Sequence, residues 1–208
     1  TSGSGTAGDY HWAELCQLVA GSWHSRAFAG DPLPTLCALA RYCQANGHAL
    51  NIEIKPTPGQ EAETGRVVAQ TAQAQWAGDD AGAEASSNGG DRAGHPSAPA
   101  KSLPVPPLLT SFQPDSLAAA QAAAPALPRG LLLDTLWVGW LDTARRLGCV
   151  AVVCNHALWD VHTVAQVHAA GMRCISYTVN DEWAAQRLIA LGTDGIITDR
   201  VDLFSPSV

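Results

Sequence analysis

The stretch GLLLDTLWVGWLDTARRLGCVAVVCNHALWDVHTVAQVHAAGMRCISYTV, residues 130–179, alternates short apolar runs with longer segments of helical periodicity. We interpret the apolar runs as strands, at 130–134, 150–155 and 173–179, and the segments between them as helices, at 137–147 and 159–170. The strands are apolar almost throughout rather than alternating, which is typical of parallel strands buried on both faces. The stretch therefore predicts an α/β fold.

The same alternation continues on both sides of this stretch. Further strands are predicted at 49–54, 108–112 and 195–198, and further helices at 35–46, 63–76, 114–124 and 181–191. Glycines that suit the ends of these helices stand at Gly47, Gly148, Gly171 and Gly192, and Asn180 is placed to cap the last helix. Such repetition forms either a barrel or a doubly wound sheet. No G-x-G-x-x-G motif follows a strand, which favours the barrel, although the pattern alone leaves the two close.

The composition is that of one globular domain with a large interior: 208 residues, 47% hydrophobic and 15% charged. A formal net charge of -7, with no cluster of Lys and Arg, argues against a nucleic-acid partner. No run of 18 apolar residues is present, which excludes a membrane span by helix. Six cysteines are scattered without a C-x-x-C pair, which indicates buried reduced thiols and a cytoplasmic location. No pattern indicates an oligomeric state.

Residues 77–107 differ from the rest of the chain. They consist mainly of Ala, Gly, Ser, Asp and Pro, and almost no large apolar residue occurs before Leu103. A segment of this composition cannot bury enough apolar surface to form a core. We therefore predict a flexible insertion on the surface of a single domain; a lid over a functional site is the sharper alternative.

The hexapeptide Asn51-Ile52-Glu53-Ile54-Lys55-Pro56 carries the main functional signal. On a strand, Glu53 and Lys55 share one face and the two isoleucines share the other. In a parallel barrel, charged side chains at the carboxyl end of a strand lie where such enzymes place their chemistry. The alternative is a plain interior salt bridge between Glu53 and Lys55.

This strand, with a glutamate and a lysine on either side of an isoleucine, resembles that of the glycerophosphodiester phosphodiesterases. Other segments resemble the family in the same order: Thr1–Gly5, Trp12–Leu15, Ala20–Trp23, Gly30–Leu36, Ser111–Phe112, Arg129–Leu132, Tyr177–Asn180 and Gly192–Asp199. The resemblance covers the chain except for 77–107 and is greatest to bacterial cytoplasmic members. It implies a TIM-type (β/α)8 barrel that hydrolyses glycerophosphodiesters to sn-glycerol 3-phosphate and an alcohol with a divalent cation, in glycerophospholipid and glycerol metabolism.

The resemblance also implies roles for individual residues. Glu53 matches a metal ligand of the family, and a carboxylate suits Mg²⁺ or Ca²⁺. Lys55 matches the lysine that holds the substrate phosphate. Phe112 and Tyr177 match positions that line the substrate pocket, Tyr177 standing where many relatives have tryptophan; ordinary core packing is the alternative for Phe112. Asp199 is expected to organise the site rather than to react. For Asn180 we favour a cap on the following helix, and a side chain that reaches into the site is the alternative.

Three elements of the family pattern are absent from these 208 residues: a His-Arg-Gly strand, a Glu-x-Asp pair and a His-Asp pair. The seven histidines stand in other contexts, so we assign none of them a catalytic role, and we expect His162 and His168 to be surface residues. The chain is thus predicted to lack the first strands of the barrel and to be inactive and poorly soluble if expressed alone. A non-catalytic binding module and an unrelated barrel that binds sugar phosphates are the alternatives. The second alternative expects phosphate-binding glycines on the loops after the last two strands. Gly192 and Gly195 flank the start of a strand instead, which argues against it.

Overall fold

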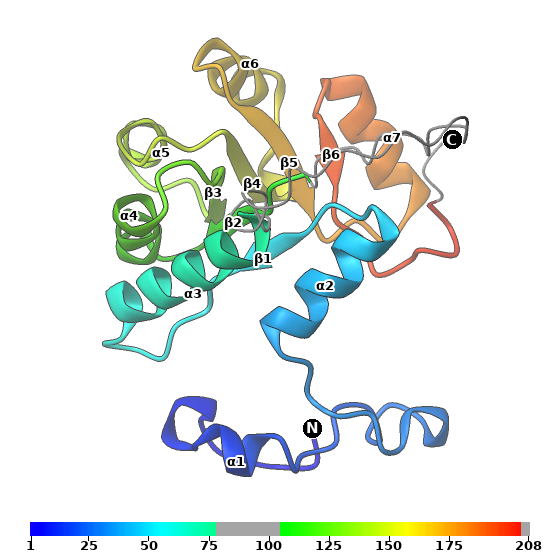
Figure 1. The fold of residues 1–208 in the computed structure, drawn as a ribbon. Helices are drawn as coiled ribbons and strands as arrows, with labels where there is room; N and C mark the ends of the chain where they lie inside the picture. Colours follow the sequence, from blue (N-terminus) through cyan, green and yellow to red (C-terminus); the bar gives the residue numbers. More distant parts are fainter. Residues whose placement is uncertain (78–104, 205–208) are drawn as a thin grey trace, which may run out of the picture.

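The computed structural model describes residues 1–77 and 105–204, and it contains one sheet of six parallel strands (Figure 1). The strands are β1 (Asn51–Glu53), β2 (Leu108–Ser111), β3 (Arg129–Leu133), β4 (Ala151–Asn155), β5 (Arg173–Tyr177) and β6 (Gly195–Ile196). Each pairs with the next in chain order, so that the sheet runs β1-β2-β3-β4-β5-β6. The sheet curls into a partial (β/α)8 barrel (Figure 1), as the family resemblance implied.

Helices alternate with the strands and cover the convex side of the sheet (Figure 1). They are α2 (Leu36–Asn46), α3 (Glu61–Trp76), α4 (Pro114–Ala123), α5 (Trp140–Arg146), α6 (Val161–Ala169) and α7 (Glu182–Leu191). The predicted glycines at 47, 148, 171 and 192 all have positive φ, between +60° and +81°. They end helices in the left-handed conformation that other residues avoid. No helix in 1–77 or 105–204 has both the length and the hydrophobicity that a membrane span needs.

The sequence predictions differ from the structure at the starts of several helices. Helix α3 begins at Glu61 rather than at Glu63. Helix α5 begins at Trp140 rather than at Trp137, because the chain turns at Gly139 with φ +87°. Helix α6 begins at Val161 rather than at Trp159, because a 3-10 turn over His156–Leu158 follows β4. The predicted cap of α7 was wrong by one residue, since the Asp181 side chain accepts the hydrogen bond from the Ala184 amide at 2.8 Å. The predicted insertion at 77–107 lies almost entirely outside the described residues.

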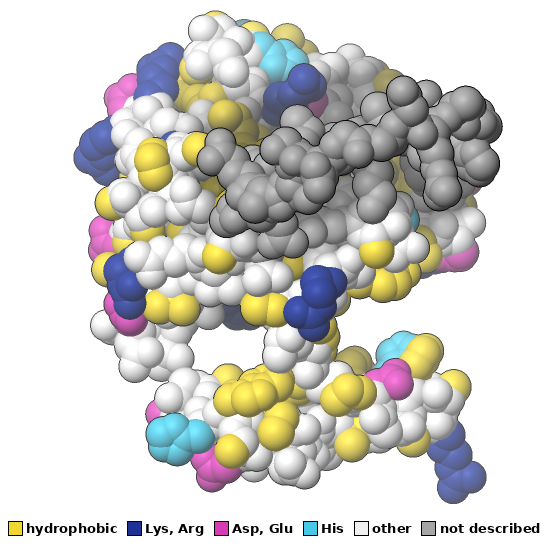
Figure 2. All heavy atoms as spheres, viewed as in Figure 1, with side chains coloured by type: hydrophobic (Ala, Val, Ile, Leu, Met, Phe, Trp, Pro, Cys, Tyr) yellow, Lys and Arg dark blue, Asp and Glu magenta, His cyan; other side chains and the backbone are white. Residues whose placement is uncertain are grey.

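Residues 1–34 form a separate lobe that extends from the start of α2 (Figures 1 and 2). The lobe contains α1 (Trp12–Leu15) and two 3-10 turns, Ala7–Asp9 and Arg26–Phe28. An antiparallel bridge between Val19 and Pro32 closes it. Its large side chains are largely exposed, with Trp23 at 72%. The lobe thus contributes no residue to the two apolar clusters that pack against the sheet, which are described next.

Two apolar clusters hold the helices against the sheet. The larger joins β3, β4 and β5 to α5, α6 and α7 through fully buried residues such as Leu131, Val152 and Leu188. The smaller joins β1 and β2 to α3 and α4 through Ile54, Leu109 and the alanines of both helices. Small residues allow α3 and α4 to approach closely in this second cluster.

Replacement of Gly65 by alanine is expected to destabilise the protein by about 2–3 kcal/mol. A methyl group at Gly65, in α3, would overlap the backbone carbonyl of Ser116 in α4. In an unobstructed helix the same replacement stabilises by about 1 kcal/mol, so the sign of the effect is diagnostic. Urea unfolding of both proteins measures it, and a more stable variant would show that the two helices are not in close contact.

Arg129, at the start of β3, is a buried cation that binds backbone oxygens only, among the described residues. Its guanidinium donates to the carbonyls of Leu127 (2.7 Å), Leu147 (3.0 Å), Pro125 (3.2 Å) and Gly148 (3.4 Å). Burial lowers the pKa of this guanidinium, with the Cys149 thiol acting in the opposite direction. The side chain thereby joins the loop before β3 to the end of α5.

Replacement of Arg129 by methionine is expected to lower the free energy of unfolding by about 3 kcal/mol, because several carbonyls then lose their donor in a buried place. Arg145→Met is the matched control. Arg145 is exposed and pairs with Asp142 at 3.1 Å, so its loss is expected to cost less than about 1 kcal/mol. Equal effects of the two replacements in urea unfolding would contradict a structural role for Arg129.

Candidate active site

The carboxyl end of β1 presents two charged side chains on one face. Ile54 is 2% exposed and belongs to the smaller core cluster, whereas Glu53 and Lys55 are exposed. The alternation in burial shows that Glu53 and Lys55 share a face, as the period of a strand requires. Asn51 lies on the same face, where its Oδ1 accepts a hydrogen bond from Thr110 Oγ1 of β2 at 3.1 Å. This face is the concave side of the sheet, opposite the helices.

Phe112 and Tyr177 meet across the same concave side. Phe112 directly follows β2 and Tyr177 ends β5, and these strands are not neighbours in the sheet. The two rings nevertheless make an edge-to-face contact, with centroids 5.9 Å apart and planes at 86°. Their contact requires the sheet to curl, and it is the geometry that aromatic pairs prefer. Phe112 is 39% exposed and belongs to neither core cluster, so ordinary core packing does not describe it.

The Tyr177 hydroxyl is fixed and neutral. It donates to the carbonyl oxygen of Leu133 at 2.8 Å. Burial raises the pKa of the Tyr177 phenol to about 12, and the negative charges of Asp134 and Glu53 add to the effect of burial. The phenol therefore stays protonated at neutral pH and acts as a donor.

Asn180 joins the ends of β5 and β6. Its Oδ1 accepts from the Thr198 hydroxyl (3.1 Å) and the Asp199 amide (3.0 Å), and its Nδ2 donates to Asp199 Oδ2 (3.1 Å). Asn180 thus fixes Thr198 and Asp199 instead of capping α7. The residue that caps α7 is the neighbouring Asp181, and Asn and Asp are equally good capping residues, so the sequence alone did not distinguish them.

At the Glu53 end of the sheet, the described residues supply only some of the ligands that a hard divalent cation needs. Glu53 offers the carboxylate oxygens that such a cation prefers, and Asp134 follows β3 at the same end. In residues 1–77 and 105–204, however, His, Cys, Asp and Glu side chains converge in a group of three at one place only, formed by His168, Cys174 and Asp194. That group lies at the amino ends of β5 and β6, away from Glu53. The described residues at the Glu53 end therefore do not complete a metal site.

Comparison with known proteins assigns the family. The profile of the "Glycerophosphoryl diester phosphodiesterase family" matches residues 1–203. The chain belongs to this family. Members of the glycerophosphoryl diester phosphodiesterase family are phosphoric diester hydrolases and generally depend on a divalent cation. The resemblance of the strand and loop motifs is thereby confirmed over essentially the whole chain.

Individual members of the family show the same likeness. YhdW of Bacillus subtilis (strain 168), named as a candidate glycerophosphodiester phosphodiesterase, is 29% identical over 97% of this chain and 73% of its own length. An Oleispira antarctica phosphodiesterase, solved in complex with the product sn-glycerol-3-phosphate, is 27% identical with a TM-score of 0.77. The match covers 95% of this chain and 70% of that protein. A glycerophosphodiester phosphodiesterase from Agrobacterium tumefaciens str. C58 has the same fold, with a TM-score of 0.66 at 20% identity, over 99% of this chain and 75% of its own.

Proposed function

We propose that the protein hydrolyses glycerophosphodiesters to sn-glycerol 3-phosphate and an alcohol, with Mg²⁺ or Ca²⁺, in cytoplasmic glycerophospholipid metabolism. The observation that carries the proposal is the pair Glu53 and Lys55 on the concave face of β1, at the carboxyl end where barrel enzymes react their substrates. Family membership supports the reaction class. The product bound in the Oleispira antarctica relative supports sn-glycerol 3-phosphate as the common part of the substrates.

The concave side provides complementary groups for such a substrate. The Lys55 ammonium would pair with the phosphate and balance the charge that grows on it in the transition state. Glu53 would hold the divalent cation, and the chemistry supplied there is polarisation of a phosphoryl oxygen. The rings of Phe112 and Tyr177 would form an apolar wall against the glycerol carbons, positioned by the bond from Tyr177 to the Leu133 carbonyl. Asn180 would keep Asp199 at the rim of the site.

We further propose that residues 1–208 form one domain and that two more strands, between β6 and β1, complete the barrel. Eight strands close a barrel of this type, and the described sheet has six. These strands would supply the remaining metal ligands and the groups that transfer protons. With residues 1–208 alone we therefore expect binding of sn-glycerol 3-phosphate without turnover. Coding sequence upstream of Thr1 that specifies His-Arg-Gly, Glu-x-Asp and His-Asp in frame would support the closed barrel.

The test measures turnover and binding separately. The protein that contains residues 1–208 together with the two proposed strands is called the closed-barrel protein. Glycerophosphocholine is incubated with the closed-barrel protein and with residues 1–208, and released sn-glycerol 3-phosphate is quantified enzymatically with and without EDTA. Turnover that EDTA abolishes and Mg²⁺ or Ca²⁺ restores is the expected result for the closed barrel. If that protein binds sn-glycerol 3-phosphate in calorimetry but hydrolyses no glycerophosphodiester, it is a binding module. If it does neither, both functions are wrong.

A further inference from the structure

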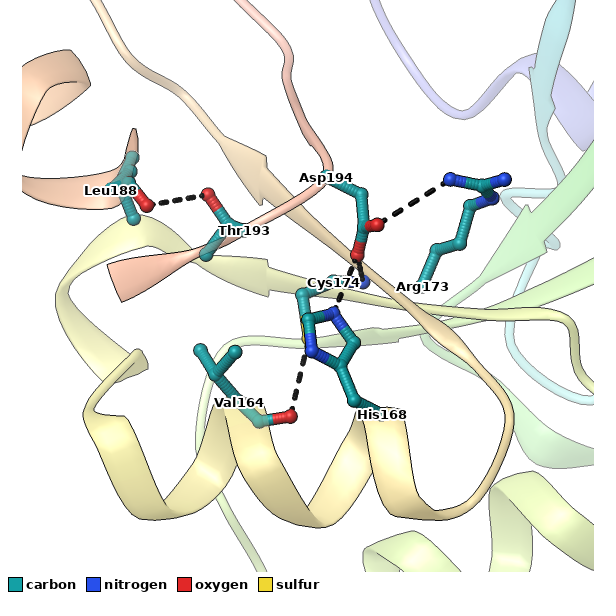
Figure 3. A network of polar contacts seen from close by, with 7 residues as sticks. All are labelled: Val164, His168, Arg173, Cys174, Leu188, Thr193 and Asp194. Atoms are coloured by element: carbon teal, nitrogen blue, oxygen red, sulfur yellow. Dashed lines mark hydrogen bonds and ion pairs between the residues drawn. The ribbon is translucent and has the colours of Figure 1, made fainter. Parts of the chain in front are cut away.

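A second cluster of ligating side chains, drawn in Figure 3, lies at the amino ends of β5 and β6. Glu53 lies instead at the carboxyl end of β1. His168 comes from the last turn of α6, Cys174 is the second residue of β5, and Asp194 immediately precedes β6. The potential ligand atoms of all three lie within 4.8 Å of one another. Three separate elements thus bring an imidazole, a thiol and a carboxylate to one point, at the amino ends of the strands.

The orientation of these three groups is fixed by the fold. Asp194 Oδ2 accepts from the Cys174 amide at 2.7 Å and lies 2.9 Å from His168 Nε2. The Cys174 side chain is fully buried and points toward the same place, with its Sγ 3.9 Å from the Val164 carbonyl oxygen. Hydrogen bonds of this kind from backbone amides to ligating carboxylates hold metal ligands in position.

The donor set matches zinc better than a hard cation. Zinc binds Cys, His and Asp in tetrahedral sites, with bonds of about 2.0–2.3 Å, so its ligand atoms stand roughly 3.5 Å apart. A shift of roughly 1 Å would bring the most distant donors of the cluster to that separation. Mg²⁺ and Ca²⁺ prefer oxygen ligands alone. A thiol and an imidazole therefore select for Zn²⁺, or for Co²⁺ as its spectroscopic substitute.

Two groups oppose the binding of a cation here: the Arg173 guanidinium, which can move away, and the Cys174 thiol, which can lose its proton. Arg173 pairs with Asp194 Oδ1 at 3.4 Å, but its side chain is 75% exposed and can turn into water. Burial raises the pKa of the Cys174 thiol to about 12, with the Asp194 carboxylate adding to the effect. A coordinating metal displaces such a proton outright. The His168 side chain is 41% exposed, so an ion and a water ligand can reach the cluster from solvent.

We propose that His168, Cys174 and Asp194 form a three-ligand zinc site with one position open to water. The site is separate from the phosphodiesterase centre, and it joins α6 to the amino ends of β5 and β6. Because the amino ends of barrel strands contribute to stability rather than to catalysis, the bound ion stabilises the fold and takes no part in hydrolysis.

Titration of residues 1–208 with Co²⁺, in the presence of excess Mg²⁺, tests this site. We expect a thiolate-to-cobalt charge-transfer band in the near ultraviolet and the intense visible bands of a tetrahedral complex. Zn²⁺ should displace Co²⁺ and raise the melting temperature. Both spectral features should disappear in Cys174→Ala, and the affinity should fall at least tenfold in His168→Gln and in Asp194→Asn.

Matched variants separate the proposal from its alternatives. Cys149→Ala removes another buried thiol, His162→Gln another histidine of α6, and Glu53→Gln the carboxylate at the opposite end; all three should keep the bands. His168 is partly exposed, so His168→Gln remains decisive even if Cys174→Ala fails to fold. Absence of a thiolate band in the parent protein would overturn the proposal. An unchanged cobalt affinity in His168→Gln would also overturn it, because His168 would then be no ligand.

Discussion

Replacement of Glu53 by glutamine is expected to reduce kcat/KM for glycerophosphocholine at least about a thousandfold in the closed-barrel protein. A thousandfold change corresponds to about 4 kcal/mol of transition-state stabilisation. Glutamine has the shape of glutamate but lacks its charge, and a neutral amide oxygen is a poor substitute for a carboxylate on Mg²⁺ or Ca²⁺. Glu53 is exposed on the concave face of β1, so the replacement removes no core contact. The loss should therefore appear in catalysis and not in stability.

The measurement is steady-state hydrolysis across a range of Mg²⁺ and Ca²⁺ concentrations, together with the melting temperature. Glu63→Gln is the matched control, because Glu63 lies on the exposed face of α3 and pairs there with Arg66. That control should retain parental kinetics and the parental cation dependence. Activity of Glu53→Gln within tenfold of the parent, with unchanged cation dependence, would exclude Glu53 as a metal ligand.

The order of strands and helices could be predicted from sequence because the strands are buried on both sides. Runs such as Gly130–Asp134 and Val150–Asn155 are apolar at almost every position, so both faces of each strand must be buried. Glycines such as Gly171 and Gly192 mark the residues at which helices end. The choice between a barrel and a doubly wound sheet could not be made from this pattern. The choice depends on how far the sheet curls. The contact between Phe112 and Tyr177, which lie at the ends of β2 and β5 with β3 and β4 between them, shows that the sheet is strongly curled.

Without the family resemblance, the candidate site was predictable only where it depends on neighbours along one strand. The period of two places Glu53 and Lys55 together whatever the rest of the fold. The bonds of Asn180 to Thr198 and Asp199 depend instead on the pairing of β5 with β6, so the local sequence favoured a helix cap. The cluster of His168, Cys174 and Asp194 depends on the same pairing and on the angle of α6. The exposure predicted for His168 was correct, but its partners were not foreseeable.

Replacement of Lys55 by methionine is expected to lower kcat/KM for glycerophosphocholine about a hundred- to a thousandfold, or about 3–4 kcal/mol. Methionine keeps most of the aliphatic stem and removes the ammonium that would face the phosphate. Because sn-glycerol 3-phosphate is anionic, like the phosphodiester substrate, its binding should also weaken, at least tenfold in calorimetry. Lys55→Arg keeps the charge in a different geometry and should recover part of both losses.

Arg66→Met, on the exposed face of α3, is the control for the loss of a cation elsewhere and should leave both measurements unchanged.

The two proposed roles also predict how the effects of replacing Glu53 and Lys55 combine. If both act on one phosphate, directly or through a cation, the double variant Glu53→Gln/Lys55→Met should lose less than the product of the single losses, because each single variant already disables the shared step. Multiplicative losses would mean that the two side chains act independently. Unimpaired binding of sn-glycerol 3-phosphate by Lys55→Met would exclude Lys55 from the phosphate site.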